Sequence, residues 1–166
     1  MLIAKELAAL SALYAATGGS KWVNKRHWLS PTVDPCAADG WFGVVCDPEF
    51  GETINNLQMP ENSLSGTAPT ELGALTSLHG ALNLHSNSLR GTLPSQLGRL
   101  TKLSHGIYFH RNSLTGELPS ELGLMSRMNT NFQLNHNSFV GRVPSELGLL
   151  THMEQGLWLC NNHLVG

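Results

Sequence analysis

The chain has 166 residues, of which 13% are charged, and its formal net charge is -2 at pH 7. This length suits one domain with a substantial buried core, and the charge excludes a basic face for nucleic acid. The longest apolar stretch, residues 1–16, contains Lys5 and Glu6 and is too short to span a bilayer. We therefore predict neither a membrane span nor a signal peptide in this sequence.

The first predicted element is a helix at the start of the chain, which the pair Gly18-Gly19 brings to an end. Its apolar residues recur at helical spacing: Ile3, Leu7, Leu10, Leu13 and Tyr14. Residues 1–53 lack the repeat that fills the remainder of the chain. We therefore expect the apolar face of this helix to cover the first repeat, whose edge would otherwise face water.

The three cysteines fall into two groups. Cys36 and Cys46 lie close together in a stretch rich in Pro, Gly and Trp, whereas Cys160 stands alone. A bond between the first two would favour an oxidising compartment, because disulfides rarely persist in the cytosol.

From residue 54 onwards the sequence repeats every 25 residues. The glycines of the repeat are Gly66, Gly91, Gly116, Gly141 and Gly166, and the asparagines are Asn62, Asn87, Asn112, Asn137 and Asn162. Just before each asparagine the residues alternate between apolar and variable, as in Leu82-Asn83-Leu84 and Ile107-Tyr108-Phe109. This period of two predicts a short strand with one buried face in every repeat.

A fixed period with the pattern L-x-L-x-x-N-x-L resembles the leucine-rich-repeat family. The resemblance implies an α/β solenoid, a right-handed superhelix with a concave parallel β-sheet of about five strands and a helical N-terminal cap. Residues 1–53 would form the capping module, and residues 54–166 would form four and a half to five coils. In this family the repeated asparagines form an internal ladder, which implies a structural role for Asn62, Asn87, Asn112, Asn137 and Asn162.

Two further motifs refine the resemblance. Segments such as Leu114–Gly123, which reads LTGELPSELG, resemble the plant-type subclass, although one extra residue per repeat is similar to algal and other protist proteins. The run Trp41-Phe42-Gly43-Val44-Val45-Cys46 resembles the family's N-terminal capping module. That likeness implies a Cys36–Cys46 disulfide and core positions for the cap tryptophans Trp22, Trp28 and Trp41.

The variable strand residues define three rows on the concave side. The rows are Gln58, Asn83, Tyr108, Gln133, Trp158, then Pro60, His85, His110, Asn135, Cys160, and finally Glu61, Ser86, Arg111, His136, Asn161. Variation within a constant frame is typical of a recognition surface, and Tyr, Trp and Arg are common binding hot spots. The predicted partner contacts are Asn83, His85, Tyr108, His110, Arg111, Gln133, Asn135, His136 and Trp158. The alternative is that these positions are merely polar.

Metal binding and catalysis are not predicted. His85 and His110 occupy adjacent strands, but Asn135 is a weak ligand and Cys160 lies two strands further on. The sequence contains no phosphate-binding Gly-rich loop and no H-E-x-x-H, C-x-x-C or G-x-S-x-G motif. We therefore predict no cofactor, no metal and no enzymatic activity.

Three functions remain open on the sequence alone. The first is recognition of a protein or peptide, or of a glycan, on the concave face. The second is a structural subunit of a larger, membrane-associated assembly, with a partner, further repeats or a second copy covering the C-terminal edge. The third is a glycan- or ice-binding surface protein, for which the Thr67, Thr92, Glu117, Arg142 row is too charged. The expected location is the extracellular space, the cell surface or an oxidising lumen.

Overall fold

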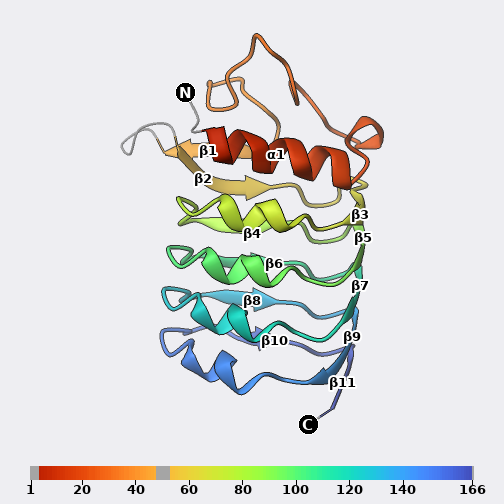
Figure 1. Ribbon diagram of the computed structural model, residues 1–166, viewed down its shortest axis with the longest axis vertical. Coiled ribbons are helices and arrows are strands. Elements are labelled where there is room, and N and C mark those ends of the chain that lie inside the picture. Colours follow the sequence, from red (N-terminus) through yellow and green to blue (C-terminus); the bar gives the residue numbers. More distant parts are fainter. Residues whose placement is uncertain (1–3, 48–52, 166) are drawn as a thin grey trace.

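The computed structural model describes residues 4–47 and 53–165. The chain is a solenoid of stacked coils that begins with helix α1 (Ala4–Ala16), as Figure 1 shows. Each complete coil contributes a strand to one sheet, a strand to a second sheet and a short helix between consecutive coils. The predicted solenoid with a helical N-terminal segment is confirmed.

The first sheet carries the predicted strands. Its order is β1-β2-β4-β6-β8-β10, and the five strands from β2 onwards are parallel. The strands are β1 (Val44–Asp47), β2 (Thr53–Gln58), β4 (Ala81–Asn83), β6 (Gly106–Tyr108), β8 (Asn131–Gln133) and β10 (Leu157–Trp158). Leu82 lies opposite Ile107, and Phe132 lies opposite Leu157, so partners are 25 residues apart. Strand β1, which pairs antiparallel with β2, was not predicted.

A second parallel sheet lies along another side of the solenoid (Figure 1), and it too was not predicted. It consists of β3 (Ser65–Thr67), β5 (Ser88–Gly91), β7 (Ser113–Gly116), β9 (Ser138–Arg142) and β11 (His163–Val165). The repeated glycine lies in this sheet in a left-handed conformation, with φ of 75° at Gly91 and 79° at Gly116. Glycine adopts this conformation without the steric penalty of a Cβ atom.

The short helices between coils are 3₁₀ helices of five residues: η2 (Thr70–Ala74), η3 (Ser95–Arg99), η4 (Ser120–Leu124) and η5 (Ser145–Leu149). A three-residue 3₁₀ helix, η1 (Gly19–Lys21), follows α1. A proline precedes each of η2 to η5, with φ between -75° and -59°. Proline suits this position because its φ is already fixed near the helical value and the first helical residues need no amide donor.

Neighbouring coils pack so tightly at the glycine of the repeated Leu-Gly pair that no larger side chain fits there. A Cβ atom added at Gly98 would lie 2.2 Å from the Glu121 carbonyl oxygen in the next coil. The same position in the last coil, Gly148, has open space around it. In the strand that follows, Leu157 is 41% exposed, although the equivalent residues of earlier coils, Leu82, Ile107 and Phe132, are fully buried.

Helix α1 packs on the first coil with a different face from the one predicted. Leu10 and Leu13 are fully buried as expected, but Leu7 is 40% exposed and Glu6 is completely buried. The buried positions 6, 9, 10 and 13 still follow helical spacing, so the stripe is rotated and contains an acidic residue. The prediction that Leu7 packs on the first coil is wrong. It was based on hydrophobicity, which favours a leucine over a glutamate at a buried position, whereas the structure buries Glu6 instead. Ile3 lies outside the described residues.

Glu6 is an unusual core residue. Neither of its carboxylate oxygens makes a hydrogen bond of normal geometry with a described residue, although the Ser77 hydroxyl and the Ile54 amide lie near enough to favour the charged form. Burial raises the pKa of Glu6, and the opposing effects of the Ser77 hydroxyl, the Ile54 amide and the Lys5 charge do not offset it. Burial favours the neutral carboxylic acid because a charged carboxylate is poorly solvated in the core.

The capping segment is held by aromatic packing and one disulfide. The tryptophans Trp22, Trp28 and Trp41 are at most 7% exposed, which confirms their predicted core positions. Trp28 lies between the other two, at ring-centroid distances of 4.8 and 5.2 Å. The predicted Cys36–Cys46 disulfide is also confirmed. Closing so short a loop contributes roughly 2–3 kcal/mol in the chain-entropy model.

The packing between coils yields a stability prediction. We expect Gly98→Ala to lower the free energy of unfolding by about 2 kcal/mol, because its methyl group would push the next coil away. Gly148→Ala is the matched control, and we expect it to change the free energy by less than about 0.5 kcal/mol. Urea unfolding followed by circular dichroism measures both. Equal destabilisation by the two substitutions would contradict the inter-coil contact.

Candidate functional site

The concave sheet displays the variable residues as three rows. Row one, formed by Gln58, Asn83, Tyr108, Gln133 and Trp158, follows directly from the strand register. Asn83 donates a hydrogen bond from Nδ2 to Gln58 Oε1 at 3.0 Å, so neighbours in the row touch. The Tyr108 hydroxyl donates to the His105 carbonyl at 3.1 Å, and Trp158 is 50% exposed at the end of the row.

The backbone ladder between coils continues beyond the strands and aligns the other rows. Leu84 N donates to Tyr108 O at 2.8 Å, and Ser86 N donates to His110 O at 2.9 Å. Equivalent bonds join the later coils. Row two therefore consists of Pro60, His85, His110, Asn135 and Cys160, and row three consists of Glu61, Ser86, Arg111, His136 and Asn161.

Row two contains a stacked histidine pair. The rings of His85 and His110 are nearly parallel, with an interplanar angle of 18° and centroids 4.4 Å apart. His85 Nδ1 lies 3.0 Å from Ser86 Oγ, whereas His110 Nδ1 and Asn135 Oδ1 are buried with no hydrogen-bond partner among the described residues. In two stacked rings the nitrogen lone pairs lie in parallel planes and do not converge on one point, as they would have to in order to bind the same metal ion. In residues 4–47 and 53–165 no three His, Cys, Asp or Glu side chains could hold a metal ion together.

The electrostatics of the stack favour neutral imidazoles. Burial lowers the pKa of His85, although the Glu61 carboxylate partly opposes the shift. Burial also lowers the pKa of His110, and the nearby His85, Arg111 and His136 act in the same direction. A second positive charge beside the first would be repelled, because like charges in a partly desolvated site disfavour each other.

Row three has an unusual backbone. All five residues, Glu61, Ser86, Arg111, His136 and Asn161, have φ between 51° and 55°. This left-handed conformation costs about 1–2 kcal/mol for a residue with a Cβ atom, so the rest of the coil must enforce it. The sequence gives no sign of this conformation, because the glycine that usually marks it is absent. Glu61 was not among the predicted contacts, although its carboxylate raises the pKa of His85 and so partly opposes the effect of burial.

The repeated asparagines hold this conformation in place. Asn112 Oδ1 accepts from Leu89 N at 2.9 Å, and its Nδ2 donates to Leu84 O at 3.1 Å and Phe109 O at 3.0 Å. The remaining asparagines make related bonds between or within coils. At the N-terminal end, Asn62 Nδ2 donates to the Asn24 carbonyl at 2.8 Å and so joins the first coil to the cap. Each asparagine therefore fixes the residue of row three that directly precedes it.

The predicted contact residues thus lie together on one surface. Row one supplies Asn83, Tyr108, Gln133 and Trp158, row two supplies His85, His110 and Asn135, and row three supplies Arg111 and His136. Arg111, His136 and Trp158 are exposed, and the other six are partly exposed. Cys160, the free cysteine, is exposed at the end of row two.

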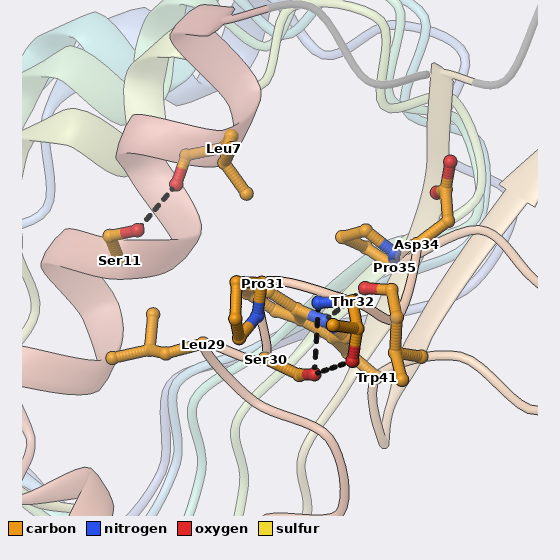
Figure 2. A pocket seen from close by; sticks show the side chains of 10 residues that line it. Leu7, Ser11, Leu29, Ser30, Pro31, Thr32, Asp34, Pro35 and Trp41 are labelled. Carbon is orange, nitrogen blue, oxygen red and sulfur yellow. Dashed lines mark hydrogen bonds between the residues drawn. The ribbon is translucent and has the colours of Figure 1, made fainter.

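A separate hollow of about 430 Å³ lies in the cap. Figure 2 shows Leu7 and Ser11 of α1 on one side, and Pro31, Thr32 and Pro35 on the opposite side. Trp41 forms part of the floor, and its indole donates to the Val33 carbonyl at 3.1 Å. The hollow explains the exposure of Leu7, which sequence hydrophobicity did not predict. None of its residues belongs to the three rows.

Comparison with known proteins supports the same architecture. Residues 81–100 match the model of the Leucine Rich Repeat family. The ectodomain of BIR2 from Arabidopsis thaliana is 27% identical with a TM-score of 0.83, and the match covers 97% of this chain and 82% of that one. The ectodomain of the receptor kinase SOBIR1 from the same plant is 25% identical with a TM-score of 0.78, covering 99% and 83%.

A third similar structure is the BIR3–SERK2 complex from Arabidopsis thaliana, at 27% identity and a TM-score of 0.77, covering 97% of this chain and 84% of that one. No curated protein sequence matches. The repeat, the parallel sheet and these structures together show that the chain has the leucine-rich-repeat fold. None of the described helices is long and apolar enough to cross a bilayer.

The histidine stack yields a prediction for pH dependence. Because both folded-state pKa values are lowered, the unfolded chain binds more protons than the folded one at pH values just below 6.5, the ordinary pKa of histidine. The free energy of unfolding should therefore fall as pH drops from 7 through 6.5 to the folded-state values. His85→Gln combined with His110→Gln should flatten this fall in urea titrations across pH 7 to 5.

The matched control is His163→Gln, which replaces an exposed histidine in β11 away from the stack. A pH profile of the double variant that ran parallel to the wild-type profile would show that the stack does not couple protonation to folding.

Proposed function

We propose that this chain is a non-enzymatic recognition module that binds a protein or peptide through the concave rows. The observation that carries the proposal is the contrast within each coil. The positions of Leu82 and Leu84 are apolar in every coil and that of Asn87 is always asparagine, so these three hold the frame, whereas the residues between and after them vary between coils. A rigid frame with variable side chains reduces the entropy lost on binding.

The chemistry of the rows suits an extended peptide or a protein loop. Tyr108 and Trp158 offer aromatic surface with a polar atom, and Arg111 offers a planar cation, which are the residue types enriched at binding hot spots. The five parallel strands span about 20 Å at normal strand spacing. That length fits five to six residues of extended peptide, at about 3.3–3.6 Å per residue.

Partner binding by proteins of similar structure also supports this proposal. One of them is a complex between two proteins, BIR3 and SERK2, and another similar structure is an ectodomain in complex with CASPARIAN STRIP INTEGRITY FACTOR 2. We extend partner binding from those proteins to this chain as part of the proposal. The Cys36–Cys46 disulfide favours a location in an oxidising compartment, outside the cell or in a lumen.

A role as a structural subunit would use a different surface. Leu149 and Val165 are 58% and 56% exposed on the last described coil, where a neighbour could pack. The concave rows favour recognition instead, because a purely structural contact would not require their residues to vary between coils while the frame stays constant.

Binding can be tested with peptides selected against the wild-type chain from a random peptide library. Tyr108→Ala combined with Trp158→Ala should weaken the selected peptides at least about tenfold, since hot-spot aromatics contribute more than 1 kcal/mol each. The affinity is measured by fluorescence anisotropy, and thermal unfolding checks that the variant is folded.

Leu124→Ala combined with Leu149→Ala is the matched control. These leucines are 55% and 58% exposed on the 3₁₀ helices, so the variant removes apolar surface from the opposite side. It should change affinity less than about twofold. If the control weakened the peptides while the concave variant did not, the proposed site would be on the wrong face.

A further inference from the structure

The loops that lead from each 3₁₀ helix into the next strand stack on one another along one edge of the solenoid (Figure 1). Ser104 N donates to His79 O at 2.9 Å, Asn129 N donates to Ser104 O at 3.0 Å, and Glu154 N donates to Asn129 O at 2.9 Å. This ladder fixes the register of the loops. Residues two positions earlier, Ser77, Lys102 and Arg127, therefore follow one another on successive coils.

The stacking places two cations side by side. Lys102 and Arg127 are both exposed and occupy equivalent positions in adjacent coils, which strand spacing puts about 5 Å apart. Among the described residues, no carboxylate forms an ion pair with either side chain. Asp47, which lies on the same edge, is engaged with His79 at 3.2 Å. Two cations on neighbouring coils attract an anion that reaches both of them.

The two cations line a pocket of about 580 Å³ together with hydroxyl side chains. Its other lining residues are Thr53, Ser77, His79 and Ser104. Ser104 is held in place because its hydroxyl donates to the His79 carbonyl at 2.6 Å. This volume lies in the range of small-molecule sites and exceeds what one inorganic anion needs. None of the six residues belongs to the concave rows, so this pocket is independent of the proposed partner site.

We propose that this basic pocket binds a sugar-sized ligand that carries a sulfate or phosphate ester. The planar guanidinium of Arg127 matches two oxygens of a tetrahedral oxyanion, and the Lys102 ammonium adds a second charge-assisted bond. The Thr53 hydroxyl can donate a hydrogen bond to a hydroxyl of the ligand or accept one from it. An ester bound between them would contact both cations at once.

Three matched probes test the proposal by isothermal titration calorimetry on the full chain. They are N-acetylglucosamine 6-sulfate, N-acetylglucosamine 6-phosphate and unsubstituted N-acetylglucosamine. We expect at least one ester to bind at least about tenfold more tightly than the unsubstituted sugar, and the tighter ester identifies which oxyanion the pocket prefers. Affinity should fall as salt is raised from about 50 to 200 mM, because charged groups carry the interaction.

Lys102→Gln combined with Arg127→Gln should reduce the ester affinity at least about tenfold, and the exposure of both residues should leave folding intact. The matched control, Arg90→Gln combined with Arg99→Gln, removes the same charge from exposed positions in β5 and η3 and should change affinity less than twofold. Ester binding no tighter than that of the unsubstituted sugar would overturn the proposal. So would equal losses in the two double variants, which would mean that net charge alone attracts the ester.

Discussion

The register between neighbouring coils is the constraint on which every other feature depends. Backbone bonds such as Leu84 N to Tyr108 O pass from one coil to the next, and the side chain of Asn112 ties the turn after the strand to the coil before it. Buried backbone groups must find partners, and a coil has few within itself. A shift of one residue would break these bonds and turn the leucines of a strand away from the core.

The same register determines what the surface can present. Because the frame repeats, a side chain at one variable position has the equivalent side chain of the next coil as its neighbour. On the concave face this creates the His85–His110 stack, and on the loop edge it creates the Lys102–Arg127 pair. Neither pair is adjacent in sequence. Both arise from a 25-residue separation, so substitutions at the variable positions change the surface without changing the fold.

Periodicity made much of this architecture predictable. The strand positions, the buried tryptophans and the Cys36–Cys46 pair could be inferred because repeats and motifs report directly on core positions. The rotation of α1, which buries Glu6 and exposes Leu7, could not, because it depends on how the helix meets the first coil and the Pro31 segment. The second sheet and the left-handed conformation of Arg111 were also missed, since each depends on hydrogen bonds between coils.

Scalar couplings across hydrogen bonds, measured by NMR on isotope-labelled protein, test the register most directly. The structure predicts couplings from the amide nitrogens of Leu84, Phe109 and Leu134 to the carbonyl carbons of Tyr108, Gln133 and Trp158, respectively. Couplings that connect these nitrogens to other carbonyls, or show that the three strands are not neighbours, would contradict the stacked coils and with them both proposed sites.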